Sequence, residues 1–478
     1  MLNLDKFITS FCLAMSFATI ALYYYKTEEN QSKLLALNTD TNSEILEEET
    51  SNTVNIFVAL TTSHDKDIIE SAIDHIDDDW KEAYEIMLIE SSYFNQNHRS
   101  ANKIINLLEK KTGKNYGADY DKWFQWLWKK NPTYTDEYYA YKAIIHKRID
   151  KKFEKYFLNR DMQSNIRLDE VRWGGVLQDG IPPLRGPEMI SATQAKYLKD
   201  SNVVFGIEVN GDVRAYPKRI LAWHEMFVDT VGDVPVAGVY CTLCGTVILY
   251  KTEHDGINHE IGTSGFLYRS NKLMYDKATQ SLWSTLEGEP VIGPLVGKGI
   301  KLDYLSVVTT TWGEWKKRHP DTKVLSLNTG HQRNYGEGIA YHDYFSTDEL
   351  MFTVPEIDKS LKNKDEILSI RLPEVPDENY AIASKFLKKN PIYTSKIGNV
   401  SYTVFTDKTG AHRVYKTGKL KFSTYDKKDM ATDSNGTTWT VSEEKMTNTK
   451  GEVLERFATH NTFWFAYKAA FPKTILVD

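Results

Sequence analysis

The chain has 478 residues, and at roughly 150 residues per domain this length predicts about three folded units rather than one core. Hydrophobic residues make up 41% and charged residues 26%, which excludes a collagen-like, low-complexity or broadly disordered chain. The net charge of −6 argues against a protein that binds nucleic acid, because such proteins need a basic face. Three cysteines exclude a disulfide-stapled scaffold, whereas 28 Tyr, 20 Phe and 11 Trp favour β-rich cores and binding clefts.

Residues 1–25 contain a nearly uncharged run from Phe7 to Tyr25. As a helix this run would span about 28 Å, close to the hydrocarbon thickness of a bilayer. We therefore expect a transmembrane anchor, with a cleaved signal peptide as the alternative. Either one places the rest of the protein in the periplasm or outside the cell, and the anchor would make the membrane a partner. Residues 26–54 are polar and acidic, which predicts a linker.

Residues 55–160 have the apolar spacing of helices. Ile69, Ala72 and Ile76 step by three and four residues, and Gly113 is expected to end one helix. A Trp-rich helix is predicted from Tyr120 to Lys130, before Asn131-Pro132. Short connections between four or five helices indicate a domain that resembles helical repeats. Its tryptophans are expected to pack in the core rather than line a groove.

Residues 174–327 read as a β-rich module. Asn210-Gly211 and Asp255-Gly256 each stand between two strand-like runs, which is the signature of a hairpin with a type I′ turn.

Residues 365–478 repeat this pattern. Trp312 and Trp315, in a short helix ended by proline, have the same spacing as Trp464 and Tyr467. We therefore expect two divergent copies of one module, joined by a loop-rich connection over residues 328–364. The predicted fold class is α+β, with the helical domain first and the duplicated β-rich region after it.

The pattern that points most directly to chemistry is Cys241-Thr-Leu-Cys244-Gly245, between two predicted strands. Two cysteines at this spacing can form a knuckle that supplies two thiolates to a metal ion. His224 and Met274 are the nearest further ligands that the sequence offers. Two thiolates, an imidazole and a thioether form a soft site that suits copper, with zinc as the alternative.

A disulfide between Cys241 and Cys244 competes with the metal site, because an exported domain meets oxidising conditions. Such a disulfide would be either inert or redox-active. Exchange of the thioredoxin type is disfavoured, since that motif starts a helix and here a strand follows. The hypothesis of a serine hydrolase has even less support, because the Gly-x-Ser-x-Gly motif is absent from the sequence.

From Asp179 onward the chain resembles the family of domain of unknown function 3179, preceded by a helical extension. The resemblance rests on ordered blocks: Arg214-Ala-Tyr-Pro217, Trp223-His-Glu225, Tyr240-Cys-Thr-Leu-Cys-Gly-Thr246, Leu273-Met-Tyr-Asp276 and Ser281-Leu-Trp283. It implies export or membrane attachment but no known activity. It places Asp276, Tyr240 and Trp283 on motif positions together with His224, Met274 and the two cysteines. The family usually has proline where this chain has Thr242.

The cysteine knuckle belongs to the first copy alone. In the second copy we expect the segment Ser395–Asn399 in its place, which has no sulfur ligand.

These observations lead to two hypotheses. The first is an exported, membrane-tethered copper protein, a metal-dependent oxidoreductase that uses Cys241, Cys244 and His224. The second is a non-catalytic module that binds a ligand or a protein partner, with the cysteines as a structural pair.

Overall fold

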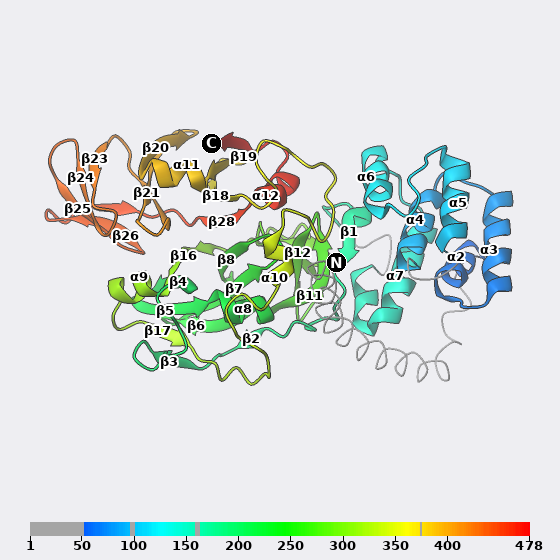
Figure 1. Ribbon diagram of the computed structural model, residues 1–478, viewed down its shortest axis with the longest axis horizontal. Coiled ribbons are helices and arrows are strands. Elements are labelled where there is room, and N and C mark those ends of the chain that lie inside the picture. The colour runs from blue at the N-terminus through cyan, green and yellow to red at the C-terminus, as the bar shows by residue number, and fades with distance from the viewer. Residues whose placement is uncertain (1–51, 96–100, 158–162, 373–374) are drawn as a thin grey trace, which may run out of the picture.

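The computed structural model describes residues 52–95, 101–157, 163–372 and 375–478. It confirms the predicted fold class, because a helical part comes first and a β-rich part with several sheets follows (Figure 1).

The predicted membrane contact requires a correction. Across the ranges that the structure describes, no helix is both long enough and apolar enough to cross a bilayer. The run from Phe7 to Tyr25 lies outside these ranges. The structure therefore does not show the predicted membrane anchor.

The helical part runs from residue 52 to residue 156. Its helices are α2 (Asn52–Thr62), α3 (Lys66–Asp78), α4 (Tyr84–Phe94), α5 (Ala101–Thr112), α6 (Tyr120–Lys130) and α7 (Asp136–Ile149), followed by the 3-10 helix η1 (Lys151–Tyr156). The side chains of Asp65, Asp119 and Thr135 accept hydrogen bonds from backbone amides at the starts of α3, α6 and α7. Gly113 ends α5 with φ +69°, as its position in the sequence predicts.

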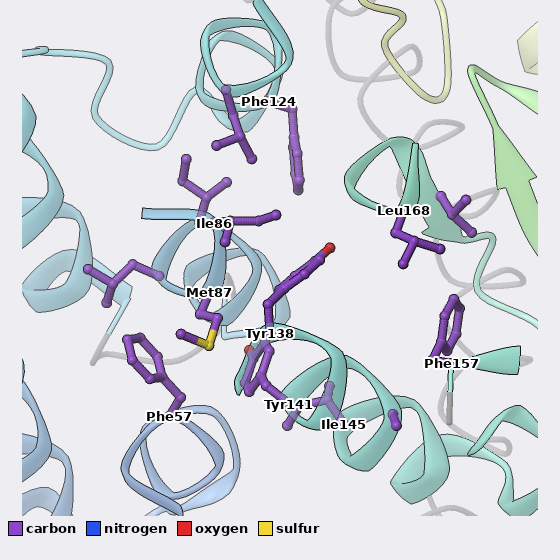
Figure 2. Packing of buried hydrophobic residues seen from close by; sticks show 14 of the residues in the cluster. Phe57, Ile86, Met87, Phe124, Tyr138, Tyr141, Ile145, Phe157 and Leu168 are labelled. Atoms are coloured by element: carbon purple, nitrogen blue, oxygen red, sulfur yellow. The ribbon is translucent and has the colours of Figure 1, made fainter. Parts of the chain in front are cut away.

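The helical part shares its core with the first β-rich module. Figure 2 shows Phe57 of α2, Met87 of α4 and Tyr141 of α7 pointing into one apolar space. The same cluster continues through Phe157 to Phe266 in the sheet. The two parts therefore stabilise each other rather than forming independent domains.

The first module, residues 171–325, contains three five-stranded sheets. The strands that place the functional residues are β4 (Val203–Val209), β5 (Asp212–Pro217), β6 (Met226–Val231), β7 (Val234–Cys241), β8 (Thr246–Lys251), β11 (Ile261–Tyr268), β12 (Asn271–Asp276) and β13 (Leu282–Ser284). The others are β1 (Val171–Trp173), β2 (Leu184–Arg185), β3 (Met189–Ser191), β9 (Glu253–His254), β10 (Ile257–Asn258), β14 (Pro290–Ile292), β15 (Tyr304–Leu305), β16 (Val308–Thr311) and β17 (Lys323–Leu325). Helices α8 (Lys218–His224) and α9 (Trp312–Arg318) complete it.

The second module contains β18 (Glu366–Leu372), β19 (Val375–Ala383), β20 (Ile392–Ile397), β21 (Val400–Thr406), β22 (His412–Lys416), β23 (Phe422–Tyr425), β24 (Met430–Asp433), β25 (Thr438–Val441), β26 (Lys445–Asn448), β27 (Val453–Glu455), β28 (His460–Phe463) and β29 (Ile475–Val477). Its helices are α11 (Ser384–Lys389) and α12 (Trp464–Ala470).

The two modules repeat one topology. The sheet order β16-β4-β5-β17 in the first module corresponds to β28-β18-β19-β29 in the second. In both, the last strand runs parallel to its neighbour and the other pairs are antiparallel. The helix that begins at Trp312 corresponds to the one that begins at Trp464, as the aromatic spacing predicts.

The repeat corrects the predicted counterpart of the cysteine knuckle. The meander β6-β7-β8 matches β20-β21-β22, so the turn between β7 and β8 corresponds to the turn between β21 and β22. That turn lies at Asp407–Ala411, whereas residues 397–400 match the preceding turn. The predicted segment lies one hairpin earlier in the chain than the true counterpart of the cysteine turn. The sequence does not show which strands pair, so it does not show which turns of the two modules are equivalent. The corrected segment has no cysteine either.

Candidate functional site

Cys241 and Cys244 form a disulfide in the structure, with their Cα atoms 5.3 Å apart. Cys241 is the last residue of β7, and a tight turn carries the chain through Cys244 into β8. Gly245 closes this turn with φ +62°, a conformation that residues with a Cβ rarely adopt. Both cysteines are buried, with 2% and 0% of their surface exposed.

His224 ends α8 and is fully buried. Its Nδ1 lies 2.9 Å from the carbonyl oxygen of Pro182, and its Nε2 lies 2.6 Å from the hydroxyl of Tyr335. Burial lowers the pKa of His224 to about 4. The imidazole is therefore neutral at pH 7, and both of its nitrogens already have partners.

Met274 of β12 lies in a different apolar cluster from the cysteines, together with Val239 and Trp283. The structure therefore brings the two cysteines together but does not group Met274 or His224 with them. Throughout the described residues, no group of three or more His, Cys, Asp or Glu side chains could hold a metal ion. Copper or zinc at the predicted ligands stays a prediction.

Asp276, the next motif residue on β12, holds a turn in place. It accepts hydrogen bonds from the backbone and side chain of Thr279, and it lies 3.1 Å from Nδ1 of buried His259. These contacts give Asp276 a structural role in the hairpin.

Tyr240 of β7 points to the side of the strand opposite Cys241 and packs against Phe205, with ring centroids 5.0 Å apart. Its hydroxyl and that of Thr242 are buried, and neither has a hydrogen-bond partner in the part of the chain that the structure describes. Buried hydroxyl groups without a hydrogen-bond partner are rare in folded proteins.

A buried ion pair that the sequence does not reveal joins β12 to Glu225, the residue between α8 and β6. Nζ of Lys272, on β12, is 3.2 Å from Oε2 of Glu225 and 3.3 Å from the carbonyl oxygen of the same residue. That carbonyl also accepts a hydrogen bond from the amide of Tyr240, the neighbour of Cys241. Burial lowers the pKa of Lys272, and the negative charge of Glu225 opposes this shift.

Strand geometry places Lys272 on the side of β12 that faces β7, the strand that ends at Cys241. Met274 of β12 and Val239 of β7 pack in one apolar cluster, so these side chains lie on the sides of the two strands that face each other. Residues two positions apart in a strand point to the same side, so Lys272 and Cys241 also lie on the facing sides. Sγ of Cys244 lies 3.4 Å from the carbonyl oxygen of Ser270, in the turn just before β12. A reduced Cys244 could therefore donate its thiol hydrogen to Ser270 without rearrangement.

The connection over residues 328–364 covers the disulfide. Its helix α10 (His342–Ser346) supplies Tyr344, whose hydroxyl donates a hydrogen bond of 2.6 Å to the carbonyl of Leu243 within the turn. Val354 and Phe463 pack in the same cluster as the sulfurs. The cover thus consists of the connection and part of the second module.

Glu225 could have been noticed from its place in the Trp223-His-Glu225 block, and Lys272 from its place just before Leu273. Nothing in the sequence pairs them, because they are far apart in the chain and meet only through packing. Glu225 also has φ +54°, an uncommon value for a residue with a Cβ, and such strain is often found at functional sites.

Comparison with known proteins identifies one family. Its model, described as a protein of unknown function (DUF3179), matches residues 178–474 and includes every element of the disulfide site. The search found no match among curated proteins and none among solved structures. Because the family model covers more than half of the chain, this protein belongs to the DUF3179 family and carries an N-terminal helical extension.

Proposed function

We propose that this protein is an exported thiol–disulfide redox protein whose reacting group is the Cys241–Cys244 pair. The observation that carries the proposal is the contact between Sγ of Cys244 and the carbonyl oxygen of Ser270. The site can hold the closed disulfide, and it also supplies a hydrogen-bond acceptor for the thiol of reduced Cys244. Export is part of the proposal, since disulfides persist in oxidising compartments.

The reaction takes two electrons from a dithiol substrate. One substrate thiolate attacks a sulfur of the pair, the S–S bond breaks, and the other cysteine leaves as a thiolate. The second substrate thiolate then attacks the mixed disulfide and releases the second cysteine. The products are an oxidised substrate and reduced Cys241 and Cys244, each of which takes up a proton in its thiol form.

Lys272 is the group that favours the thiolate in this scheme. A cation beside a cysteine lowers the thiol pKa, and Glu225 helps to keep the Lys272 ammonium charged although it is buried. Lys272 is thus a positioning residue that acts on the charge of the sulfur rather than on the substrate.

The reduction potential tests this role. The protein is equilibrated with mixtures of reduced and oxidised dithiothreitol, and its free thiols are trapped with a maleimide. Mass spectrometry of the product then gives the reduction potential of the cysteine pair. Lys272→Met should make it more negative by about 30 mV, which corresponds to a tenfold change in the equilibrium constant. It should also raise the pKa of the more acidic thiol by about one unit.

The control is Lys142→Met, which breaks another buried ion pair, between Lys142 and Glu90 at 2.8 Å in the helical part. This variant should lose stability but keep the potential of the parent protein. Equal potentials for the parent and both variants would remove Lys272 from the proposal. A pair that resists reduction in the folded protein would overturn the redox function itself.

Complete burial of the sulfurs favours one competing function, the non-catalytic binding module with a structural disulfide. That function predicts reduction of the pair only after unfolding. The copper prediction has its own test, in which the reduced protein is titrated with Cu(I). Stoichiometric binding that a Cys241→Ser, Cys244→Ser variant loses would support it.

A further inference from the structure

A cavity of about 940 Å³ lies between the helical part and the β-rich part. Helix α6 supplies one wall, and the opposite side comes from residues 167–170, Arg269 and the segment Pro355–Glu356. This volume falls within the range of pockets that bind small molecules.

Aromatic rings form part of the cavity lining. Trp126 and Tyr116 are both partly exposed there, whereas neighbouring Trp123 is fully buried in the core. The ammonium of Lys130 lies 5.2 Å from the centre of the Trp126 ring. A partly exposed aromatic face beside a cation is suited to stacking against the apolar face of another ring.

The charge of the lining is mostly positive, with six basic and two acidic side chains. Glu170, one of the acids, is buried and already paired with Arg167 and Arg269. Lys114 and Lys129 line the cavity and form no ion pair with any residue that the structure describes, and Glu356 is the acid left at the rim.

We propose that this cavity binds an acidic saccharide, a ligand whose sugar rings stack on Trp126 and Tyr116 and whose carboxylates pair with Lys114 and Lys129. Arg167 and Arg269 donate hydrogen bonds to the carbonyls of Trp128 and Ala469, which holds their positive charges in place in the lining. This site does not depend on the redox state of the cysteines.

The test is isothermal titration calorimetry with tetragalacturonate as the probe and cellotetraose as its neutral counterpart. Tetragalacturonate should bind, and its affinity should fall as the salt concentration rises. Lys114→Gln together with Lys129→Gln should weaken binding about tenfold, and Trp126→Ala should do the same. Trp126→Phe should restore part of the affinity, because a flat ring is kept.

The matched control is Lys152→Gln, which removes an exposed lysine of the helical part outside the cavity. It should leave the affinity unchanged, as should the Cys241→Ser, Cys244→Ser variant. The proposal is overturned if tetragalacturonate does not bind, if cellotetraose binds equally well, or if the cavity variants bind as tightly as Lys152→Gln.

Discussion

At the scale of single residues, the disulfide turn depends on backbone conformations that few residues adopt. Gly245 has φ +62°, and a Cβ built on it would come within 2.7 Å of the ring of Phe463. Glu225 has a positive φ as well, at the C-terminus of α8. Gly245 lies in the disulfide turn and Glu225 forms the buried ion pair with Lys272, so the site combines local strain with close packing.

Gly245→Ala should therefore destabilise the protein by about 2–4 kcal/mol, because the new methyl group adds a clash to the backbone strain. Gly256→Ala is the matched control, since Gly256 has φ +76° but nothing within 4 Å of a Cβ. Its cost should be only about 1 kcal/mol, from the backbone alone. Urea unfolding of both variants measures the difference, and equal losses would contradict a tight contact with Phe463.

At the scale of elements, a hydrogen bond from Tyr344 attaches α10 to the disulfide turn. Tyr344 donates to Leu243, and the ammonium of Lys364 lies 3.4 Å from the centre of the Tyr344 ring. Between residues 328 and 364 the chain contains one short helix. Such a segment can open at a smaller free-energy cost than the strands beneath it.

Tyr344→Phe should speed the reduction of Cys241–Cys244 by dithiothreitol several-fold, because the cover loses a hydrogen bond worth about 1 kcal/mol. Stopped-flow trapping of free thiols gives the rate. The control is Tyr415→Phe, which removes a comparable hydrogen bond of 2.5 Å to the carbonyl of Ser442 in the second module. If both variants are reduced at the same rate as the parent, α10 does not limit access.

At the scale of the whole molecule, a buried ionic network joins the two modules. Glu443 accepts hydrogen bonds from Arg413 and Arg456 of its own module, and it lies 3.0 Å from Nε of Arg318 on α9 of the first. Burial by itself would raise the pKa of Glu443, but Arg413 and the neighbouring cations hold it well below its usual value. The carboxylate thus stays charged between three guanidinium groups.

Glu443→Gln should cost about 3–5 kcal/mol, because it leaves buried guanidinium groups without their counterion. Glu455→Gln removes an exposed acid of the same module and should change stability by less than about 1 kcal/mol. Thermal unfolding and limited proteolysis between the modules compare the two variants. Similar behaviour of both would show that the network does not hold the modules together.

Acid should destabilise the molecule, because several buried histidines are neutral in the fold. Burial lowers the pKa of His146, His412 and His460 to about 3. In the unfolded chain each has a pKa of about 6.5, so the unfolded state takes up protons first as the pH falls. Stability contributed by these residues is present above pH 6.5 and is lost progressively down to about pH 3.

Urea unfolding at pH 7 and pH 5 measures this loss, which should amount to several kcal/mol. His412→Gln should make the pH dependence shallower, whereas His254→Gln, at the exposed Asp255-Gly256 turn, should leave it as in the parent. A pH dependence that His412→Gln does not change would contradict a neutral, buried His412.

Much of the local structure could be predicted from the sequence. The helix Tyr120–Lys130, the type I′ turn at Asn210-Gly211 and the repeated helices that begin at Trp312 and Trp464 are all confirmed. Each depends on neighbours in the chain, such as apolar spacing and turn residues. Helix α7 ends at Ile149, where Asp150 takes an extended conformation.

The sequence by itself determined the order of the parts, the duplication and the two cysteines, because periodicity and motif spacing are properties of nearby residues. Only the tertiary structure decided that Lys272 and Glu225 form a buried ion pair, that α10 covers the disulfide turn, and that Met274 and His224 lie in other surroundings. It also decided which turn of the second module corresponds to the cysteine turn. The physical reason is that long-range strand pairing and side-chain packing, rather than local propensity, bring such residues together.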